Sequence, residues 1–172
     1  MKENIAIIGM AGAGKTTAAK LLAPQIGYLS FDTDEYVEFM RGQKISEIIS
    51  LYGEGSFREL EAQSAECACI FDKAVISLGG GAVLDEKVMR EIQKTCYIVY
   101  LSCCAKTCYA RIKKSGVVRP LFSPLTVEKI EEVLSSRKPL YEKYADITIV
   151  SDGKSAKKVT AEILDALKDI KY

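Results

Sequence analysis

A glycine-rich stretch near the start of the chain constrains its fold more than any other feature. Residues 9–17 read Gly-Met-Ala-Gly-Ala-Gly-Lys-Thr-Thr, which fits the pattern G-x-x-x-x-G-K-[ST]. The apolar run 5–8 precedes this stretch and the helix-forming run 18–23 follows it, so the pattern has the flanking strand and helix that a phosphate-binding loop requires. The sequence therefore predicts an α/β fold built around a phosphate site.

The residue types of this loop suit a nucleoside triphosphate. Glycine lets backbone N–H groups face phosphate oxygens without interference from a Cβ, and the N-terminal end of the following helix attracts anions. Lys15 is expected to reach the β- and γ-phosphates, and the Thr16 hydroxyl is expected to bind Mg²⁺. The residues expected to bind ATP in this loop are Gly12, Ala13, Gly14, Lys15, Thr16 and Thr17.

The composition is that of one globular domain. The 172 residues are 48% hydrophobic and 27% charged, which is close to globular averages. A net charge of +1 gives no electrostatic reason to expect nucleic acid, and no apolar run reaches the length of a membrane span. Because residues 1–5 also contain no apolar signal segment, we expect a single cytoplasmic, monomeric domain over residues 1–172, with neither nucleic acid nor a membrane as partner.

The six cysteines form no recognisable metal or redox motif. The chain has no histidine and no C-x-x-C pair. Cys67 and Cys69 lie two apart on an expected helix and face different sides, whereas Cys96, Cys103 and Cys104 flank an expected strand. We interpret these cysteines as structural thiols.

Apolar runs and helix-forming segments alternate along the whole chain. Strands are expected at residues 5–8, 28–31, 74–78, 97–101 and 147–150. Helices are expected at residues 15–25, in a run ending near residue 40, and at 45–51, 56–72, 85–93, 105–114, 127–144 and 155–170. Pro139 is expected to end or kink the helix in which it lies. This alternation predicts a five-stranded parallel sheet flanked by helices.

The carboxyl ends of parallel strands are where ligands bind in such folds. This rule brings the loop 9–17, residues 32–34, residues 79–81 and residues 152–154 to one rim of the molecule. Residues 115–124 break the helical periodicity with Gly116, Pro120 and Pro124, and they are interpreted as a mobile loop.

Asp32 and Asp34 follow the second expected strand, next to the phosphate loop on the rim. If the backbone is extended there, the two carboxylates point to the same side; if it has already turned, they diverge. One carboxylate could hold Mg²⁺ through water while the other accepts a hydrogen bond from a hydroxyl that attacks the γ-phosphate. Alternatively, an aspartate here caps a helix N-terminus.

A small anionic acceptor is indicated by two further features. Arg58 and Glu61 lie three apart and share a helix face, although such a pair is most often a solvated surface contact. Gly79, Gly80 and Gly81 follow a buried strand, and such a turn suggests that the backbone approaches a ligand closely. An arginine beside exposed backbone N–H groups could bind a carboxylate.

Together these residues resemble the ordered motif set of shikimate kinases. The motifs are the loop 9–17, Asp32-x-Asp34, Gly55-Ser56-Phe57-Arg58-x-x-Glu61, Gly79-Gly80-Gly81, Arg119-Pro120-Leu121 and Arg137-x-Pro139-Leu140-Tyr141. The resemblance runs from the first strand to the last helix. It implies a three-layer P-loop fold of the nucleoside monophosphate kinase type, and ATP-dependent phosphorylation of the 3-hydroxyl of shikimate, in the pathway to chorismate and aromatic amino acids.

The resemblance also implies roles for individual residues. It implies a shikimate-binding region at about residues 32–61, in which Asp34 binds the ring hydroxyls and accepts the 3-hydroxyl proton while Asp32 helps to organise Mg²⁺. It implies that Arg119, in a lid at about residues 115–124, closes over the transferring phosphoryl group, and that Arg111 lies near the adenine. The groups implied to grip the shikimate carboxylate are Arg58, held by Glu61, with Arg137 and the backbone of Gly79, Gly80 and Gly81.

Other functions fit less well. A gluconate or nucleoside monophosphate kinase would share the phosphate loop and the lid, but Arg58, Gly79 to Gly81 and Arg137 together suit a small carboxylate. A regulatory GTPase would need N-K-x-D and D-x-x-G motifs, and the sequence has neither. The intact Lys15, Asp34, Arg119 and Arg137 argue against an inactive nucleotide-binding module.

Overall fold

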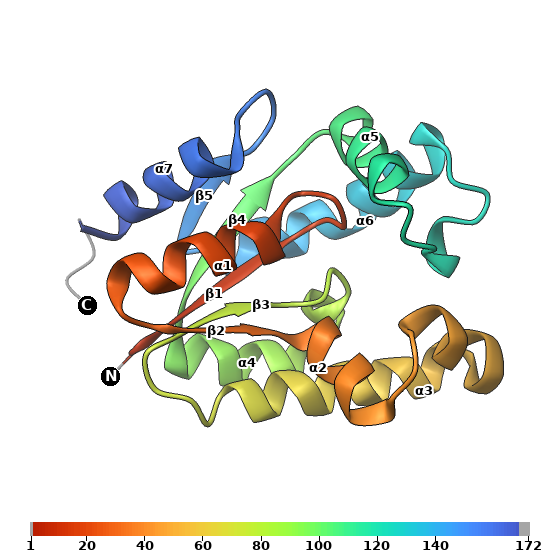
Figure 1. Cartoon of the computed structure of the whole chain (residues 1–172), viewed down its shortest axis with the longest axis horizontal. Coiled ribbons are helices and arrows are strands. Elements are labelled where there is room, and N and C mark those ends of the chain that lie inside the picture. Colours follow the sequence, from red (N-terminus) through yellow and green to blue (C-terminus); the bar gives the residue numbers. More distant parts are fainter. Residues whose placement is uncertain (1, 169–172) are drawn as a thin grey trace.

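The computed structural model describes residues 2–168 as one α/β unit around a central sheet (Figure 1). The sheet has the order β2-β3-β1-β4-β5, and every neighbouring pair is parallel. Its strands are β1 (Asn4–Gly9), β2 (Leu29–Asp32), β3 (Ala74–Ser77), β4 (Cys96–Ser102) and β5 (Ile147–Val150). The predicted five-stranded parallel sheet is therefore confirmed, with strand bounds within two residues of those expected.

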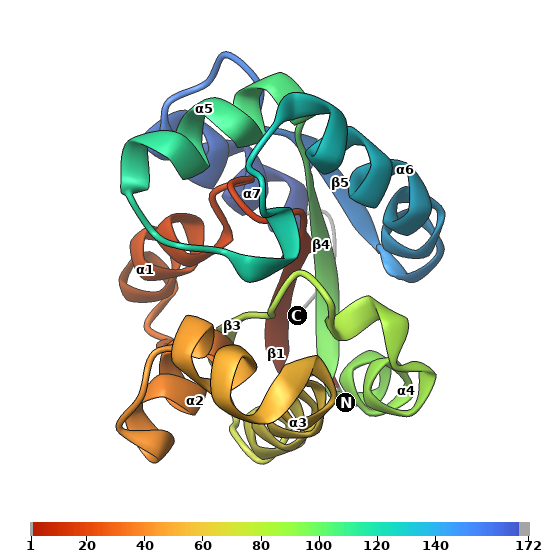
Figure 2. The same cartoon turned by 90° about the vertical axis from the view of Figure 1, so that its right-hand side faces the viewer.

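Helices cover both faces of this sheet. They are α1 (Lys15–Ile26), α2 (Thr33–Arg41), α3 (Ile45–Ala68), α4 (Glu86–Thr95), α5 (Ala105–Ser115), α6 (Val127–Tyr144) and α7 (Ala156–Lys168), with short 3₁₀ turns η1 (Ala82–Leu84) and η2 (Pro120–Phe122). Helices α1 and α7 lie together on one face, and α4 and α6 lie on the other (Figure 2). The view in Figure 2 also shows the segment between α5 and α6 opposite α2 and α3.

The core explains why the strands are almost entirely apolar. Every residue of β1 and β3 is buried, because helices cover the sheet on both sides. A second, smaller cluster forms where Val37 of α2 meets Ile48 and Phe57 of α3. This satellite core holds the α2 and α3 segment as a unit beside the main sheet.

None of the described helices is both long and apolar enough to cross a membrane.

Two expectations about helix breaks meet different outcomes. The predicted interruption at Pro139 is wrong, because α6 continues through it to Tyr144. The carbonyl of Ser135 loses its helical donor there, but Ser135 and Pro139 are both exposed, so water can satisfy it. The break between residues 51 and 56 is present as a kink within α3, where Gly53 has φ 83° and ψ 166°.

Helix α7 and the expected lid follow the last strand and α5, respectively. Helix α7 is described over Ala156–Lys168, and the predicted helical residues 169 and 170 lie outside the described part of the chain. Residues 116–124 run between α5 and α6 outside any α-helix, as predicted, but they contain η2, and Ser115 still belongs to α5. Phe122 is 3% exposed and anchors this loop on the core, so the lid is attached at an apolar point.

Candidate active site

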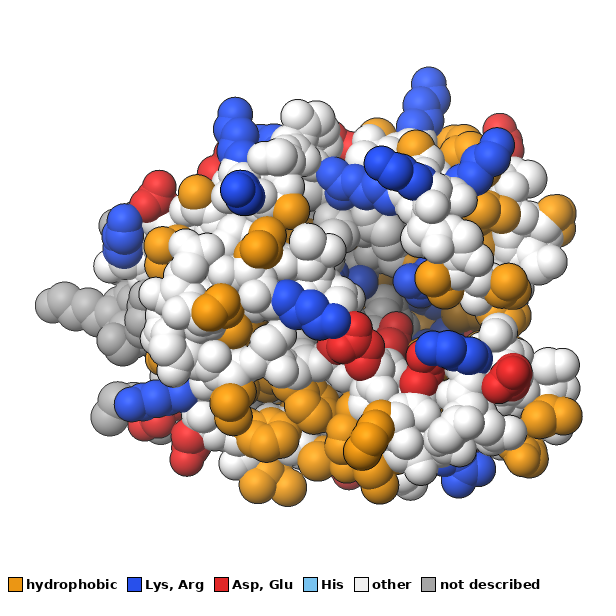
Figure 3. Space-filling view, viewed as in Figure 1, with side chains coloured by type: hydrophobic (Ala, Val, Ile, Leu, Met, Phe, Trp, Pro, Cys, Tyr) orange, Lys and Arg blue, Asp and Glu red, His pale blue; other side chains and the backbone are white. Residues whose placement is uncertain are grey.

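The carboxyl ends of the strands open onto two adjoining cavities of about 490 and 510 Å³. Figure 3 shows a hollow in the face of the molecule, with basic and acidic side chains gathered at its edge. The first cavity is lined by the phosphate loop, α5 and the start of α7, and the second by α2, α3 and the lid. The residues that line both are Ala11, Thr16, Asp32, Asp34, Gly80, Val117 and Arg119.

The phosphate loop packs closely against the backbone of α5, which restricts its shape. Gly12 has φ 82°, and a Cβ there would meet the backbone oxygen of Cys108 at 2.8 Å. Gly14 has φ 101° and begins α1 as the N-cap residue. The buried ammonium of Lys15 donates to the backbone oxygens of Gly9 (2.9 Å) and Met10 (3.1 Å). Burial lowers the pKa of Lys15, with Arg119 also lowering it and Asp34 opposing the change.

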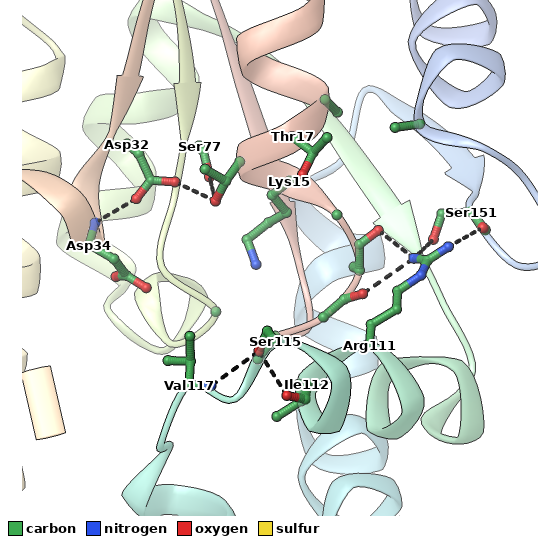
Figure 4. A pocket seen from close by; sticks show the side chains of 18 of the residues that line it. Lys15, Thr17, Asp32, Asp34, Ser77, Arg111, Ile112, Ser115, Val117 and Ser151 are labelled. Atoms are coloured by element: carbon green, nitrogen blue, oxygen red, sulfur yellow. Dashed lines mark hydrogen bonds between the residues drawn. The ribbon is translucent and has the colours of Figure 1, made fainter.

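Asp32 caps a helix, as one of the two interpretations predicted, and it also contacts the phosphate loop. Its Oδ1 caps α2 by accepting from the backbone N–H groups of Asp34 (3.0 Å) and Glu35 (3.1 Å). Its Oδ2 accepts a hydrogen bond from the Thr16 hydroxyl at 2.6 Å (Figure 4). The chain has already turned into α2 at Asp34, so the two carboxylates take different partners. Thr16 and Asp32 thus place two hard oxygen ligands side by side next to the phosphate loop.

Asp34 lies near both carboxylates and cationic side chains. Burial raises its pKa from 3.8 to about 6, and the nearby carboxylates of Asp32 and Glu61 raise it as well. Lys15 and Arg119 act in the other direction. A carboxylate with a pKa near 6 is mostly ionised at neutral pH and can still accept a proton, which suits a general base.

Arg58 is held by two carboxylates on its own helix. Its Nη1 donates to Glu61 at 2.6 Å, while Nη2 and Nε donate to Glu54 at 2.8 and 3.2 Å. Glu61 is buried, whereas Glu54 is half-exposed beside the kink at Gly53. The expected contact between Arg58 and Glu61 is therefore present, and Glu54 is an additional partner that the spacing of the motif did not single out.

Two of the three glycines after β3 lie against charged side chains, whereas a Cβ on Gly80 would make only ordinary contacts, the nearest with the Gly9 oxygen at 3.4 Å. A Cβ on Gly79 would overlap Glu61 and approach Asp34 Oδ1 at 2.8 Å, and a Cβ on Gly81 would overlap the guanidinium of Arg58. The run was expected to leave room for a ligand, and the space is taken in this structure by the site's own charged groups. Those groups line the second cavity together with Gly80 and Gly81.

The backbone of this turn is fixed by side chains from two helices, α2 and α6. Thr33, at the start of α2, accepts from the N–H of Gly79 at 2.9 Å and donates to the Ser77 oxygen at 3.3 Å. Arg137 and Tyr141 of α6 both donate to the oxygen of Gly80, at 3.1 and 2.6 Å. Sequence reasoning assigned no role to Thr33 or Tyr141. The feature of the sequence that could have indicated a role for Thr33 is its position between Asp32 and Asp34, directly after a strand.

Arg111 lines the first cavity and joins two of its walls (Figure 4). Its Nη1 donates to the backbone oxygens of Gly12 (3.3 Å) and Ala13 (3.0 Å) in the phosphate loop. The same guanidinium donates to the hydroxyl of Ser151 at 3.2 Å and, through Nη2, to its backbone oxygen at 2.9 Å. Arg111 thus ties α5 to the loop and to the segment after β5.

Arg119 projects from the lid to the boundary between the cavities. Within residues 2–168, its Nε is the one buried side-chain nitrogen or oxygen that lacks a hydrogen-bond partner. A buried donor without an acceptor is unfavourable, so this nitrogen is available to an oxygen of a bound molecule.

The cysteines form no cluster that could hold a metal ion within the described part of the chain.

Comparison with known proteins agrees with this geometry. The family model for shikimate kinase matches residues 11–168. A shikimate kinase of Coxiella burnetii is 35% identical over 167 residues, covering 96% of this chain and 93% of the relative. One of Dehalococcoides mccartyi is 36% identical, covering 97% and 94%. A solved structure of shikimate kinase from Acinetobacter baumannii in complex with shikimate has 28% identity, covers 99% of this chain and 96% of that one, and superposes with a TM-score of 0.92.

The family match separates the alternatives that the loop and the lid left open. The matched residues, 11–168, span both cavities, so the family is that of shikimate kinases and not of gluconate or nucleoside monophosphate kinases. This chain therefore belongs to the shikimate kinase family and is an ATP-dependent kinase of aromatic amino acid biosynthesis.

Proposed function

We propose that the first cavity binds ATP and the second binds shikimate, with phosphoryl transfer to the 3-hydroxyl at their boundary. The observation that carries this division is the set of shared residues, because Asp34 and Arg119 line both cavities. A reaction between two bound substrates needs its catalytic groups where the two sites meet.

The nucleotide is proposed to lie along the phosphate loop. The backbone of Gly12 to Thr17 would face the phosphates, and the Lys15 ammonium would leave the carbonyls of Gly9 and Met10 to reach the β- and γ-phosphates. Arg111 would border the base side of this cavity.

The donor set supports a magnesium site at Thr16 and Asp32. Mg²⁺ usually takes one or two protein oxygens and completes its shell with water and phosphate, and the 2.6 Å pair of Thr16 and Asp32 fits that pattern. The Thr16 hydroxyl would bind the ion directly and Asp32 through water. When bound, the ion supplies positive charge beside the phosphates.

Shikimate is proposed to place its carboxylate toward Arg58 and Arg137, two of the three arginines that line the second cavity. Its hydroxyls then face Asp34, which accepts the proton of the 3-hydroxyl as that oxygen attacks the γ-phosphorus. Arg119 neutralises charge on the transferring group, because its Nε is buried without a partner. The backbone of Gly79 to Gly81 completes the carboxylate side.

The experiment is ADP release by the purified protein with Mg-ATP and shikimate, gluconate, a nucleoside monophosphate or no acceptor. Of these acceptors, we expect only shikimate to support turnover, and we expect that turnover to be lost when Mg²⁺ is chelated. Phosphorus NMR of the product should show the phosphate ester at the 3-position. Turnover with another acceptor but not with shikimate would refute the proposed second cavity while leaving the nucleotide site intact. Sedimentation in the same buffer tests the proposed monomer.

A further inference from the structure

The backbone oxygen of Gly80 receives two hydrogen bonds from one helix. Arg137 Nη1 lies 3.1 Å from this oxygen and the Tyr141 hydroxyl lies 2.6 Å from it. The two donors are four residues apart in α6, so they share a helix face. A carbonyl oxygen has two lone pairs, so both bonds can form together.

The two donors differ in their freedom to move. Tyr141 is 0% exposed, and its ring stacks on Tyr100 of β4 with centroids 5.1 Å apart and planes 19° apart. Arg137 is 8% exposed and lines the second cavity. Burial raises the pKa of Tyr141, although Arg137 opposes this change, so the hydroxyl remains a donor at neutral pH. Tyr141 is thus a fixed donor, and Arg137 is the one that faces the cavity.

To bind a carboxylate, Arg137 must weaken its hydrogen bond to the Gly80 oxygen. A buried carbonyl left without any donor is unfavourable, and that penalty would oppose the movement of Arg137 toward a ligand. With Tyr141 in place the oxygen keeps one donor throughout. The turn is also held at Gly79 by Thr33, so its position does not depend on Arg137.

We infer that Tyr141 is a positioning residue that keeps the Gly80 oxygen hydrogen-bonded and thereby frees Arg137 to bind the shikimate carboxylate. This inference rests on the proposed role of Arg137 in the second cavity. It gives the tyrosine of the Arg137-x-Pro139-Leu140-Tyr141 motif a function in acceptor affinity, separate from its packing against Tyr100.

The test is Tyr141→Phe, which removes the hydroxyl and keeps the ring. We expect the Kd for shikimate, measured by calorimetry, to rise about five- to tenfold, since one hydrogen bond is lost from the bound state. The KM for ATP and the kcat at saturating shikimate should stay within about twofold of the wild type. The matched control is Tyr144→Phe, on the same buried face of α6, whose hydroxyl makes no hydrogen bond within residues 2–168.

A purely structural role would give a different result. In that case Tyr141→Phe would lower the melting temperature and change kcat and both KM values together, or leave all of them unchanged, and either result overturns the inference. A second measurement places Tyr141→Phe in an Arg137→Ala background, where it should no longer change the KM for shikimate. If the wild type itself shows no shikimate-dependent ADP release, the proposed function fails instead, and the two failures are thereby distinguished.

Discussion

Asp34 shows how one residue's surroundings set its chemistry. Burial and two neighbouring carboxylates raise its pKa to about 6. Because the proposed base must be ionised to accept a proton, kcat/KM for shikimate should fall as the pH drops below about 6, approaching tenfold per unit. A rate profile between pH 5 and 8.5 checks this. A profile that stays flat to pH 5 would contradict the assignment of Asp34 as the base.

The same residue should oppose stability when it is ionised. Its pKa rises from 3.8 to about 6 on folding, so the penalty is absent below pH 3.8 and complete above about pH 6. Asp34→Asn should therefore raise the free energy of unfolding at pH 7.5, by at most about 3 kcal/mol. At pH 4 the same substitution should raise the free energy of unfolding only a little. Its kcat should fall steeply at either pH. Denaturant unfolding at the two pH values tests this, with the exposed neighbour Glu35→Gln as control; equal effects at both pH values would contradict it.

The sequence identified most of the charged residues but not their contacts. Asp32 could be assigned either to a helix cap or to a metal site, and the structure shows that one carboxylate oxygen caps α2 while the other accepts a hydrogen bond from Thr16. The spacing of residues along the chain cannot reveal that a Cβ on Gly81 would overlap Arg58, because this overlap depends on how α3 packs against the turn. Tyr141 lay in a recognised motif, yet its partner, the Gly80 oxygen, is a backbone atom that no sequence pattern marks.

At the scale of elements, the alternation of strands and helices was enough to predict the sheet. Of the two predicted helix breaks, the one near Gly53 is present and the one at Pro139 is not, because solvent can satisfy the carbonyl that the proline leaves without a donor. Pro139 is tolerated inside α6 on its exposed side, whereas Gly53 kinks α3. That kink lies beside Glu54, one of the two partners of Arg58. The local break therefore contributes to the site, and proline position alone does not predict where a helix ends.

Helix α5 supports the phosphate loop from below, and Arg111 is its main polar link. Arg111→Ala removes the hydrogen bonds to Gly12, Ala13 and Ser151, so the loop should become less ordered. We expect the KM for ATP to rise about tenfold, with the KM for shikimate within twofold. Steady-state kinetics with each substrate varied in turn measures this. Lys114→Ala, an exposed change on the same helix, is the control, and equal effects on both KM values would show a general loss of structure instead.

At the scale of the whole molecule, the function depends on joining two cavities built from different parts of the chain. The first rests on the sheet through the phosphate loop, and the second depends on the satellite core of Val37, Ile48 and Phe57. The lid borders both. It is anchored by Phe122 while Val117 and Val118 remain exposed. We therefore expect each substrate to bind alone, with catalysis only when the lid contacts both.

Arg119 is the lid residue on which that arrangement depends. Because its Nε is buried without a partner and adjoins both cavities, we expect Arg119→Ala to lower kcat by about 10²- to 10³-fold, through loss of charge neutralisation in the transition state. The separate Kd values for shikimate and for ATP should change by less than threefold, since each substrate keeps its own cavity. Single-turnover kinetics and calorimetry measure the two effects independently. Val118→Ala, an exposed change in the same lid, should leave both near wild type; a kcat for Arg119→Ala within twofold of wild type would mean that the lid closes the site without taking part in transfer.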